Sequence, residues 1–377
     1  MNDLTSTTNI TDQGLMLENG HQASICLPWT WLRDHCHASH SLSPKTGQKV
    51  HTPAEVLGQA PARAVRFDSD GNLHVTWPGG GPASYYPRDF LDRFATGAPS
   101  AAATYAEPVT WAVSELPARL LRGIEAEAFL DRDAPSYREF LGDFAQYGFG
   151  LLRNVPCTVK ATEALANRIA FVGRTFYGDL GVIEARADAP ADTAWSNAAL
   201  GPHTDGTYFD KPPGLQALHC LAHDCTGGES TLVDGFRIAE TLKAKAPALY
   251  AKLCETTIPA RYIDEARHYE TDIQVLRHEG GRLVQVQYNC YDRAPFAPDE
   301  DTETLYRALT RFQELACAPE YALEFQLREG DAVIFDNWRL LHGRRAFAGR
   351  TRKLASFYIE RDAYRSALRM ATGLTIT

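Results

Sequence analysis

The sequence predicts an α+β protein that is mainly β: a double-stranded β-helix (jelly-roll) catalytic domain with helical insertions, and a small β-rich N-terminal domain. Three observations indicate this fold. Many short apolar segments are separated by turn-forming residues, few of them form βαβ units, and candidate metal ligands stand where two such segments end. Numerous short strands with a metal site at strand ends are typical of jelly-roll proteins.

Residues 1–100 supply the small domain. Turn-forming runs at 70–72 and 78–82 separate short alternating segments, as in a β-rich module. The expected strands cover residues 14–18, 64–67, 73–77 and 84–86. Small residues at 97–104 indicate a linker, and the catalytic domain is expected to span residues 105–377.

The catalytic domain mixes helical and extended patterns. Amphipathic periodicity predicts helices at 137–147, 159–171, 238–254 and 303–316. Short apolar runs predict strands at 148–153, 215–219, 230–233, 283–288, 332–335 and 355–359. The run from Ala332 to Leu341 is expected to form one buried strand that ends at His342.

Composition excludes several classes of protein. The chain of 377 residues has a formal net charge of −9, which leaves no basic face for nucleic acid. No apolar run approaches the roughly 20 residues that span a bilayer. The polar N-terminus lacks a secretion signal, and the eight cysteines show no disulfide-framework spacing. We therefore expect a cytoplasmic protein with reduced thiols.

Two segments far apart in the sequence carry candidate metal ligands. His203 and Asp205 stand two residues apart between Pro202 and Gly206, and His342 follows an apolar run. In an extended chain, residues i and i+2 face the same side, so the first pair can bind one metal ion. Two imidazoles and one carboxylate form the facial triad of non-haem Fe(II) oxygenases. An isolated His-x-Asp recurs by chance, so the flanking turns and the apolar run carry this inference.

Arg352 stands ten positions after His342. A guanidinium can hold a carboxylate through two parallel hydrogen bonds. A dicarboxylate cosubstrate would need such an anchor. Together with the candidate triad, Arg352 predicts an oxygenase that uses Fe(II), 2-oxoglutarate and O2.

Several stretches of the chain match a known family. They are ADTAWSNAALGPHTDGTYFDKPPGLQALHCL, TGGESTLVDGF, YNCYDRAPF and FDNWRLLHGRRAF, with WTWLRDHCHASHSLSPKTGQK near the N-terminus. Over nearly its whole length the chain resembles the trimethyllysine and γ-butyrobetaine hydroxylases, within the taurine-dioxygenase-like superfamily. The resemblance implies a double-stranded β-helix, Fe(II), 2-oxoglutarate and a homodimer.

The resemblance assigns residues to the iron and the cosubstrate. His203, Asp205 and His342 match the iron ligands. Arg352 matches the residue that anchors the distal carboxylate of 2-oxoglutarate, and Ser230 matches the hydroxyl residue that assists it.

The resemblance also implies a substrate pocket. Tyr177, Trp195 and Tyr358 match an aromatic cage for a trimethylammonium group, which cannot donate hydrogen bonds and is held by ring faces. Asp192 matches an Asp of the trimethyllysine branch, and Asn289 matches the first Asn of a substrate-binding motif. Each ring taken alone could equally be core packing.

The chain departs from the family at two substrate positions. Gly181 stands where the family has a cage Trp, and Cys290 stands where it has a second Asn. We therefore expect a roomier pocket, or one closed by another aromatic side chain such as Tyr208 or Tyr291.

The N-terminal domain departs as well. Of the family's zinc ligands only Cys36 remains, because Ala38 and Ser41 replace two cysteines and the loop 79–82 lacks the histidine. The structural zinc is therefore expected to be absent. Four nearby histidines could form a substitute site, although a solvated histidine-rich loop is favoured: His35, His37, His40 and His51.

The predicted activity is hydroxylation of an unactivated C–H bond in a small quaternary ammonium substrate, such as trimethyllysine, γ-butyrobetaine or 2-(trimethylammonio)ethylphosphonate. Two alternatives stay open. A zinc hydrolase could use the same three ligands, and a metabolite-binding protein could keep the fold without the chemistry. The His203–Asp205 neighbourhood shows no general base for a hydrolase, and the intact ligands with Arg352 argue against a non-catalytic protein.

Overall fold

The computed structural model describes residues 8–19, 22–58, 60–95, 107–176, 178–184 and 196–372. Two compact units divide the chain, one built from residues 1–104 with 375–377 and the other from residues 105–374. Three predicted substrate residues, Tyr177, Asp192 and Trp195, lie outside the described residues, as does the expected linker.

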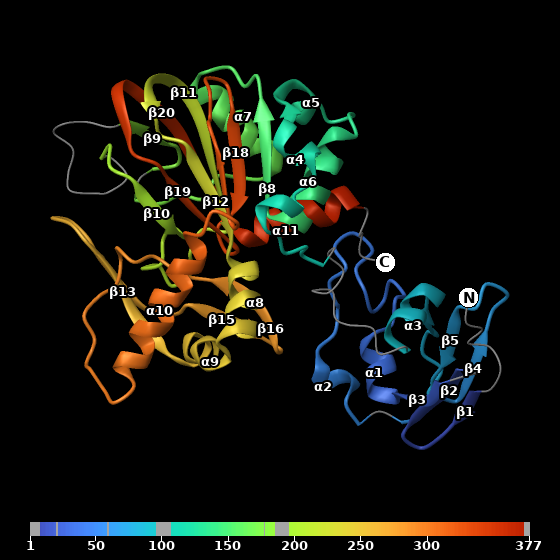
Figure 1. The fold of residues 1–377 in the computed structure, drawn as a ribbon. Helices are drawn as coiled ribbons and strands as arrows, with labels where there is room; N and C mark the ends of the chain where they lie inside the picture. The colour runs from blue at the N-terminus through green and yellow to red at the C-terminus, as the bar shows by residue number, and fades with distance from the viewer. Residues whose placement is uncertain are drawn as a thin grey trace. The chain divides into compact units, whose positions relative to one another are not determined.

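The N-terminal unit contains two three-stranded antiparallel sheets (Figure 1). The strands are β1 (Thr8–Ile10), β2 (Gly14–Asn19), β3 (Gln22–Pro28), β4 (Ala64–Phe67), β5 (Leu73–Thr76) and β6 (Ser84–Tyr86), and the helices are α1 (Trp29–Asp34), α2 (Pro53–Val56) and α3 (Arg88–Ala95). Trp29 and Trp77 meet edge to face at 6.0 Å within a core shared by both sheets. The unit therefore has a hydrophobic core of its own.

Two sheets form the centre of the catalytic unit (Figure 1). One has the order β10-β19-β12-β17 and the other β7-β8-β18-β11-β20-β9. The strands are β7 (Ile124–Glu125), β8 (Phe149–Arg153), β9 (Gly181–Glu184), β10 (Leu200–His203), β11 (Leu215–Gly227), β12 (Ser230–Asp234), β17 (Ala322–Phe325), β18 (Ala332–Asp336), β19 (Leu340–Arg344) and β20 (Phe347–Ile359). Leu232 and Leu340 of the first sheet pack with Phe149, Phe335 and Leu354 of the second. This double sheet with a shared core is the jelly roll that the sequence predicts.

Helices and two hairpins cover the double sheet. Helices α6, α7 and α11 pack their apolar faces against β8, β11, β18 and β20, while α8, α9 and α10 pack together with the hairpins β13–β14 and β15–β16. The helices are α4 (Ala118–Arg122), α5 (Ala126–Leu130), α6 (Ser136–Tyr147), α7 (Val159–Ile169), α8 (Gly235–Lys245), α9 (Pro247–Glu255), α10 (Thr302–Ala316) and α11 (Arg361–Thr372). The hairpin strands are β13 (Thr257–Ile263), β14 (His268–Gln274), β15 (Leu276–Glu279) and β16 (Arg282–Val286).

Two sequence predictions were wrong in this unit. The run 332–341 is two strands in opposite sheets, β18 and β19, so His342 lies within a strand rather than at its end. A turn separates them because Asp336 accepts hydrogen bonds from the backbone N–H of Trp338 (2.9 Å) and Arg339 (3.0 Å). The expected helix 238–254 is α8 and α9, broken before Pro247, because the residue before a proline disfavours the helical conformation.

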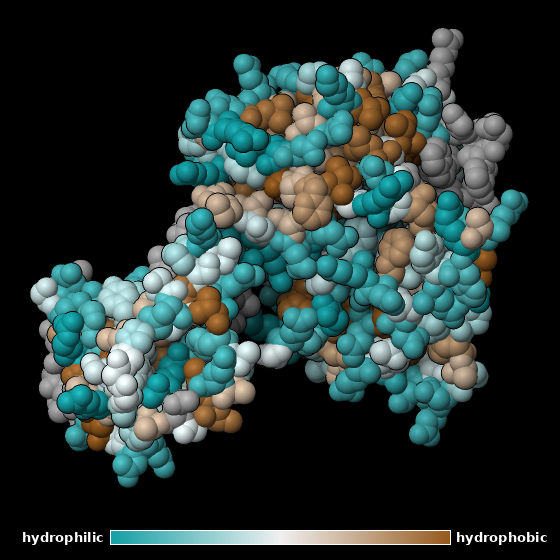
Figure 2. Space-filling model, turned by 180° about the vertical axis from the view of Figure 1, so that it is seen from behind, coloured by the Kyte–Doolittle hydropathy of each residue, from teal (hydrophilic) through white to brown (hydrophobic). Residues whose placement is uncertain are grey.

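The surface of the described residues is mixed. None of their helices is long and apolar enough to cross a membrane. Hydrophilic side chains cover much of the face shown in Figure 2, and hydrophobic ones gather over the upper part of the catalytic unit. Exposed single residues such as Phe171 and Met370 are ordinary on a protein surface.

A buried ion pair holds the β12–α8 junction to β19. Arg339 donates to both oxygens of Asp234, at 3.0 and 2.7 Å, and the two side chains are 3% and 0% exposed. Arg339 also donates to the carbonyls of Gln146 and Val109. Asp234 in turn caps α8 by accepting from the Phe236 N–H. Each partner therefore depends on the other for its charge compensation.

We expect Arg339→Met to lower the free energy of unfolding of the catalytic unit by about 3–5 kcal/mol, because it leaves the Asp234 carboxylate buried and unpaired. Urea unfolding measures this change. Arg345→Met is the control: its partner Glu324 is 2.7 Å away, but the side chains are 61% and 42% exposed. An exposed pair contributes at most about 1 kcal/mol, so equal losses in the two variants would contradict this account.

Candidate active site

The structure brings His203, Asp205 and His342 together between two strands. His203 ends β10 and is the cross-strand partner of His342 on β19, while Asp205 lies in the turn that follows β10. One oxygen of Asp205, Oδ1, is 3.3 Å from Nε2 of His203 and 3.6 Å from Nε2 of His342. Among the described residues, these three form the one group of three or more candidate metal ligands, with ligand atoms within 4.8 Å of one another.

The three side chains offer nitrogen and oxygen donors to a divalent cation, although their pKa values shift in different directions. Burial opposes a charge on His203, but Asp205 and the Gly201 carbonyl raise its pKa, so a metal ion would displace a proton from its Nε2. Nδ1 of His203 lies 2.9 Å from the Gly201 carbonyl, which directs a proton to that nitrogen and turns Nε2 toward Asp205. Burial and the neighbouring His203 lower the pKa of His342 to about 3, so its imidazole is neutral. Burial opposes the charge of Asp205, but His342, His203 and Tyr358 hold the pKa of its carboxyl well below the usual range. Two imidazole nitrogens and one carboxylate oxygen therefore converge as the donor set that non-haem iron uses.

The second oxygen of Asp205 is held by the protein. Tyr358 Oη and Gln216 Nε2 each donate to Oδ2 at 2.7 Å, and these two residues are cross-strand partners on β20 and β11. Asn337 accepts from the Asp205 N–H at 2.8 Å and donates to its carbonyl at 3.0 Å. These bonds leave Oδ1 free for a metal ion. Sequence analysis missed Gln216 and Asn337, and it assigned Tyr358 only as a cage ring.

Two buried arginines lie beside the triad strands. Burial lowers the pKa of Arg352 on β20, and burial together with the charge of Arg352 lowers the pKa of Arg344 on β19 to about 10. No acidic side chain of the described residues forms an ion pair with Arg352. A Cβ at Gly228, whose φ is +75°, would lie 3.1 Å from the Arg352 side chain, so glycine makes room for it. A buried cation without a counter-ion favours an anionic ligand.

Ser230 lies close to this arginine pair in the sheet. It is buried on β12 and is the cross-strand partner of Arg344. Gly228, against which Arg352 packs, precedes it by two residues. Arg344 itself donates to the carbonyls of Ser196 and Ala198 at 2.7 and 2.8 Å. The two residues that the resemblance assigns to 2-oxoglutarate, Arg352 and Ser230, could therefore offer a carboxylate one guanidinium and one hydroxyl.

A cavity of about 520 Å³ opens onto His203 and Asp205. Four tyrosines line it: Tyr208, Tyr262, Tyr291 and Tyr358. Gly181 also lines the cavity, so this position leaves room where a larger residue would fill it. Asn289 lines the cavity too, but its amide donates to Asp292 at 2.8 Å and accepts from the Tyr291 N–H at 3.0 Å. Cys290 packs instead against the helical cluster around α10.

An aromatic cluster stands at one side of this cavity. Phe176 lies 4.8 Å from Tyr262 and 5.4 Å from Tyr269, measured between ring centroids. Tyr208 lies 5.2 Å from Tyr262 and 4.8 Å from Phe209. These packed rings join the hairpin β13–β14 to the segment that follows the metal ligands.

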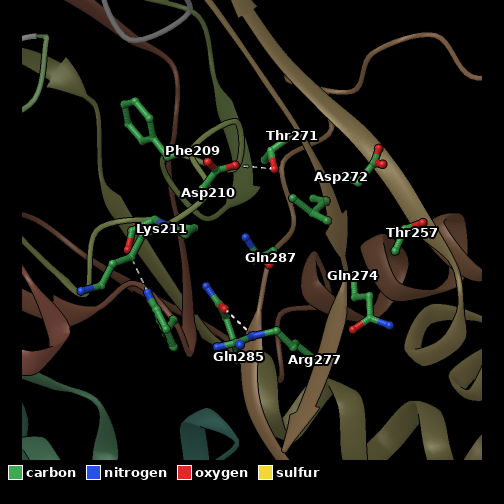
Figure 3. Close-up of a pocket in the computed structure, with 13 residues that line it drawn as sticks. Phe209, Asp210, Lys211, Thr257, Thr271, Asp272, Gln274, Arg277, Gln285 and Gln287 are labelled. Atoms are coloured by element: carbon green, nitrogen blue, oxygen red, sulfur yellow. Dashed lines mark hydrogen bonds between the residues drawn. The ribbon is translucent and has the colours of Figure 1, made fainter.

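A second cavity, of about 510 Å³, is lined in part by Phe209 (Figure 3). Its lining includes none of the three candidate metal ligands. In it Thr271 of β14 donates to Asp210 at 2.9 Å, and Arg277 donates to Gln285 at 2.9 Å (Figure 3). The first of these bonds joins the β13–β14 hairpin to the segment that follows Asp205. The cavity at the triad is therefore the candidate active site.

The four histidines named above contact acidic, aromatic and thiol side chains, and His35 and His51 both lie near Asp34. Cys36 is buried with its sulfur 3.9 Å from Nε2 of His40. His51 binds Asp34 at 3.2 Å, His35 stacks on Trp31, and His37 packs on Phe90. The expected absence of zinc from this unit stays a prediction.

We expect Tyr358→Phe to weaken metal binding by about tenfold or more, because it removes one of the two donors that orient Asp205. Calorimetric titration of the metal-free protein with Fe(II) under argon measures this affinity. Tyr262→Phe is the control, since the Tyr262 hydroxyl in the same cavity donates to Asp264 at 3.2 Å instead. An unchanged affinity in Tyr358→Phe would contradict this role.

We expect Arg352→Gln to weaken 2-oxoglutarate binding by about 2–5 kcal/mol, because a buried carboxylate loses a charge-assisted partner. Anaerobic titration of the iron-loaded protein, followed by its visible charge-transfer band, measures the affinity. Arg345→Gln, which changes an exposed arginine, should leave it unaltered. If Arg352→Gln also leaves it unaltered, Arg352 is not the anchor.

Comparison with known proteins gives the same family. Residues 112–358 match the model of the taurine catabolism dioxygenase TauD, TfdA family. The chain is 32% identical over 345 residues to the mitochondrial trimethyllysine dioxygenase of Gallus gallus, which covers 89% of this chain and 80% of that protein. It is 33% identical over 340 residues to the gamma-butyrobetaine dioxygenase of Pseudomonas sp. (strain AK-1), which covers 88% of this chain and 87% of that protein.

The fold comparison agrees with the jelly roll described above. A solved asparagine oxygenase superimposes with a TM-score of 0.50 at 17% identity, covering 60% of this chain and 79% of that one. The family match extends from the segment before α4 to Tyr358 and includes all three candidate metal ligands and Arg352. The zinc hydrolase and the non-catalytic alternative are thereby set aside. The chain belongs to the TauD/TfdA family, and it is a dioxygenase that uses Fe(II) and 2-oxoglutarate.

Proposed function

We propose that this enzyme hydroxylates an unactivated C–H bond of a small trimethylammonium compound such as trimethyllysine, γ-butyrobetaine or 2-(trimethylammonio)ethylphosphonate. The observation that carries the proposal is the tyrosine-lined cavity that opens directly onto His203 and Asp205. Relatives that cover most of the chain are a trimethyllysine dioxygenase and a gamma-butyrobetaine dioxygenase, which supports a quaternary ammonium substrate.

The tyrosines suit a cation that cannot donate hydrogen bonds. A ring face attracts a positive charge through its quadrupole, and this attraction grows when the pair is removed from water. Tyr208 is 7% exposed and packs against the partly exposed Tyr262, so the two present an aromatic wall. We propose that Tyr177 and Trp195 complete the cage, that Asp192 and Asn289 contribute to substrate binding, and that Tyr208 compensates for Gly181.

The residues of this chain act by binding and positioning. Bound iron, held by His203, Asp205 and His342, supplies the activation of O2 that couples oxidation of 2-oxoglutarate to hydroxylation. Arg352 and Ser230 orient the cosubstrate, and the aromatic wall holds the substrate so that one carbon faces the metal. Such positioning and the exclusion of water supply much of the rate in reactions of this kind.

Three further expectations from the sequence remain proposals. We propose that residues 1–100 and 105–377 act as two domains. We also propose that the protein works in the cytoplasm and that it assembles as a homodimer.

The head group of the substrate gives the test. We expect a trimethylammonium compound to bind at least about tenfold more tightly than the isostere with a neutral tert-butyl group, because each ring facing a desolvated cation contributes about 1–2 kcal/mol. Anaerobic binding to the enzyme loaded with Fe(II) and 2-oxoglutarate, followed by succinate formation in air, measures both steps. If the neutral isostere binds and reacts equally well, the quaternary ammonium class is wrong.

Trp195→Ala examines the cage within the same experiment. It should weaken binding of the trimethylammonium compound by about tenfold, while turnover of 2-oxoglutarate without substrate stays largely intact. Tyr250→Phe, which alters a tyrosine hydroxyl paired with His278 away from the cavity, serves as the control.

A further inference from the structure

Arg261 lies in the active-site cavity and the mechanism above does not use it. It stands on β13, partly buried, and it is the one lysine or arginine among the described residues that line this cavity. The buried Arg344 and Arg352 are on other strands and are absent from this lining. The cavity therefore contains a cation that belongs to neither the metal nor the 2-oxoglutarate site.

Two of the carboxylates that line the cavity, those of Asp264 and Asp292, have other partners. Asp264 accepts from Arg267 at 2.7 Å and from the Tyr262 hydroxyl at 3.2 Å. Asp292 accepts from Thr207 at 2.7 Å and from Asn289 at 2.8 Å.

Two more acidic residues lie close to Arg261 in the sheet or in the cavity wall. Glu270, the cross-strand partner of Arg261, binds His268 at 2.9 Å. Asp179 lies 3.5 Å from Arg174. In the part of the chain that the structure describes, no carboxylate pairs with the Arg261 guanidinium, so it is available to a ligand.

The backbone around Arg261 is firmly held. Its N–H donates to the Asp292 carbonyl at 2.7 Å, and Ala260 forms an isolated bridge with Arg293. The hairpin is also joined to the segment that follows Asp205. The contacts are the Tyr208–Tyr262 ring pair and the Thr271–Asp210 hydrogen bond drawn in Figure 3. The anchored strand fixes the Cα of Arg261 at the cavity wall, so only the torsions of its own side chain have to be ordered when the guanidinium binds an anion.

We propose that Arg261 recognises the anionic end of the substrate, a carboxylate or a phosphonate, at the opposite end of the molecule from its quaternary ammonium group. The planar guanidinium can hold either oxyanion through two parallel hydrogen bonds. Arg261 is thus a specificity-determining residue, and the substrate is a zwitterion whose cation meets the tyrosines and whose anion meets β13. The inference rests on the proposed function for the identity of the cationic end.

The experiment varies the head group and the tail of the ligand independently. The four probes combine a trimethylammonium or a tert-butyl head with a carboxylate or a primary amide tail, and a fifth carries the trimethylammonium head with a phosphonate tail. Binding is measured without O2, on the full chain loaded with Fe(II) and 2-oxoglutarate, by calorimetry and by the change of the visible charge-transfer band. Wild type, Arg261→Gln, Arg261→Lys and Arg267→Gln are compared.

For wild type we expect the acid to bind about ten- to hundredfold more tightly than the amide, as for a hydrogen-bonded charge. Arg261→Gln should bind acid and amide alike, with its affinity for the amide and its unfolding midpoint unchanged. Arg261→Lys should retain part of the preference for the acid, because lysine keeps the positive charge but cannot donate two parallel hydrogen bonds from a planar group. Arg267→Gln removes a cation of the same hairpin, but Arg267 is already paired with Asp264. This variant should therefore keep the wild-type ratio of acid to amide affinity.

The possible outcomes separate the inference from the proposed function. A wild-type enzyme that binds acid and amide alike overturns the inference, and so does an acid preference that survives in Arg261→Gln. Loss of the head-group preference with a tail preference that depends on Arg261 overturns the quaternary ammonium proposal and supports the role of Arg261. Comparison of the carboxylate and phosphonate probes identifies which anion the pocket takes. If none of the five probes binds, both proposals are overturned.

Discussion

The candidate metal site depends on the two oxygens of one carboxylate, that of Asp205, having different partners. One of its oxygens faces the Nε2 atoms of His203 and His342, and the other is held at 2.7 Å by both Tyr358 and Gln216. A carboxylate left without such donors would rotate and would present either oxygen to a cation. These partners come from β10 and β19 of one sheet and from β11 and β20 of the other. The geometry of the metal site therefore depends on how the two sheets pack together.

The sequence predicts the candidate metal ligands, but it does not predict the residues that hold Asp205 by hydrogen bonds. His203 and Asp205 are visible because their spacing is local, and the jelly roll follows from many short strands. Asn337 meets Asp205 across 132 positions of the chain, and Gln216 reaches it only through the register of β11 against β20. No local pattern contains that register. The two-strand structure of residues 332–344 was missed for the same reason, since the turn at Asp336 also depends on its ion pair with Arg361.

Positive charge is divided between two parts of the catalytic unit. Arg344 and Arg352 are both buried on central strands. Arg344 donates to the carbonyls of Ser196 and Ala198, whereas no acidic side chain of the described residues pairs with Arg352, whose burial favours an anionic ligand. Arg261 lies on a hairpin at the cavity wall and keeps contact with solvent. Arg261 is thus separated from the buried arginines both by its strand and by its exposure. On the two proposals made above, the buried Arg352 would bind the cosubstrate and Arg261 at the cavity wall would bind the substrate.

This division explains how departures from the family can be tolerated at the substrate positions. Gly181 and Tyr208 line the cavity but take no part in holding Asp205, and Cys290 packs against α10. Changes at these positions alter the shape of the pocket without disturbing the carboxylate on which metal binding depends. Tyr358 is different, because its hydroxyl holds Asp205 while its ring lines the cavity. Tyr358 thus joins the cavity wall to the metal centre, and a change that repositions its ring also acts on Asp205.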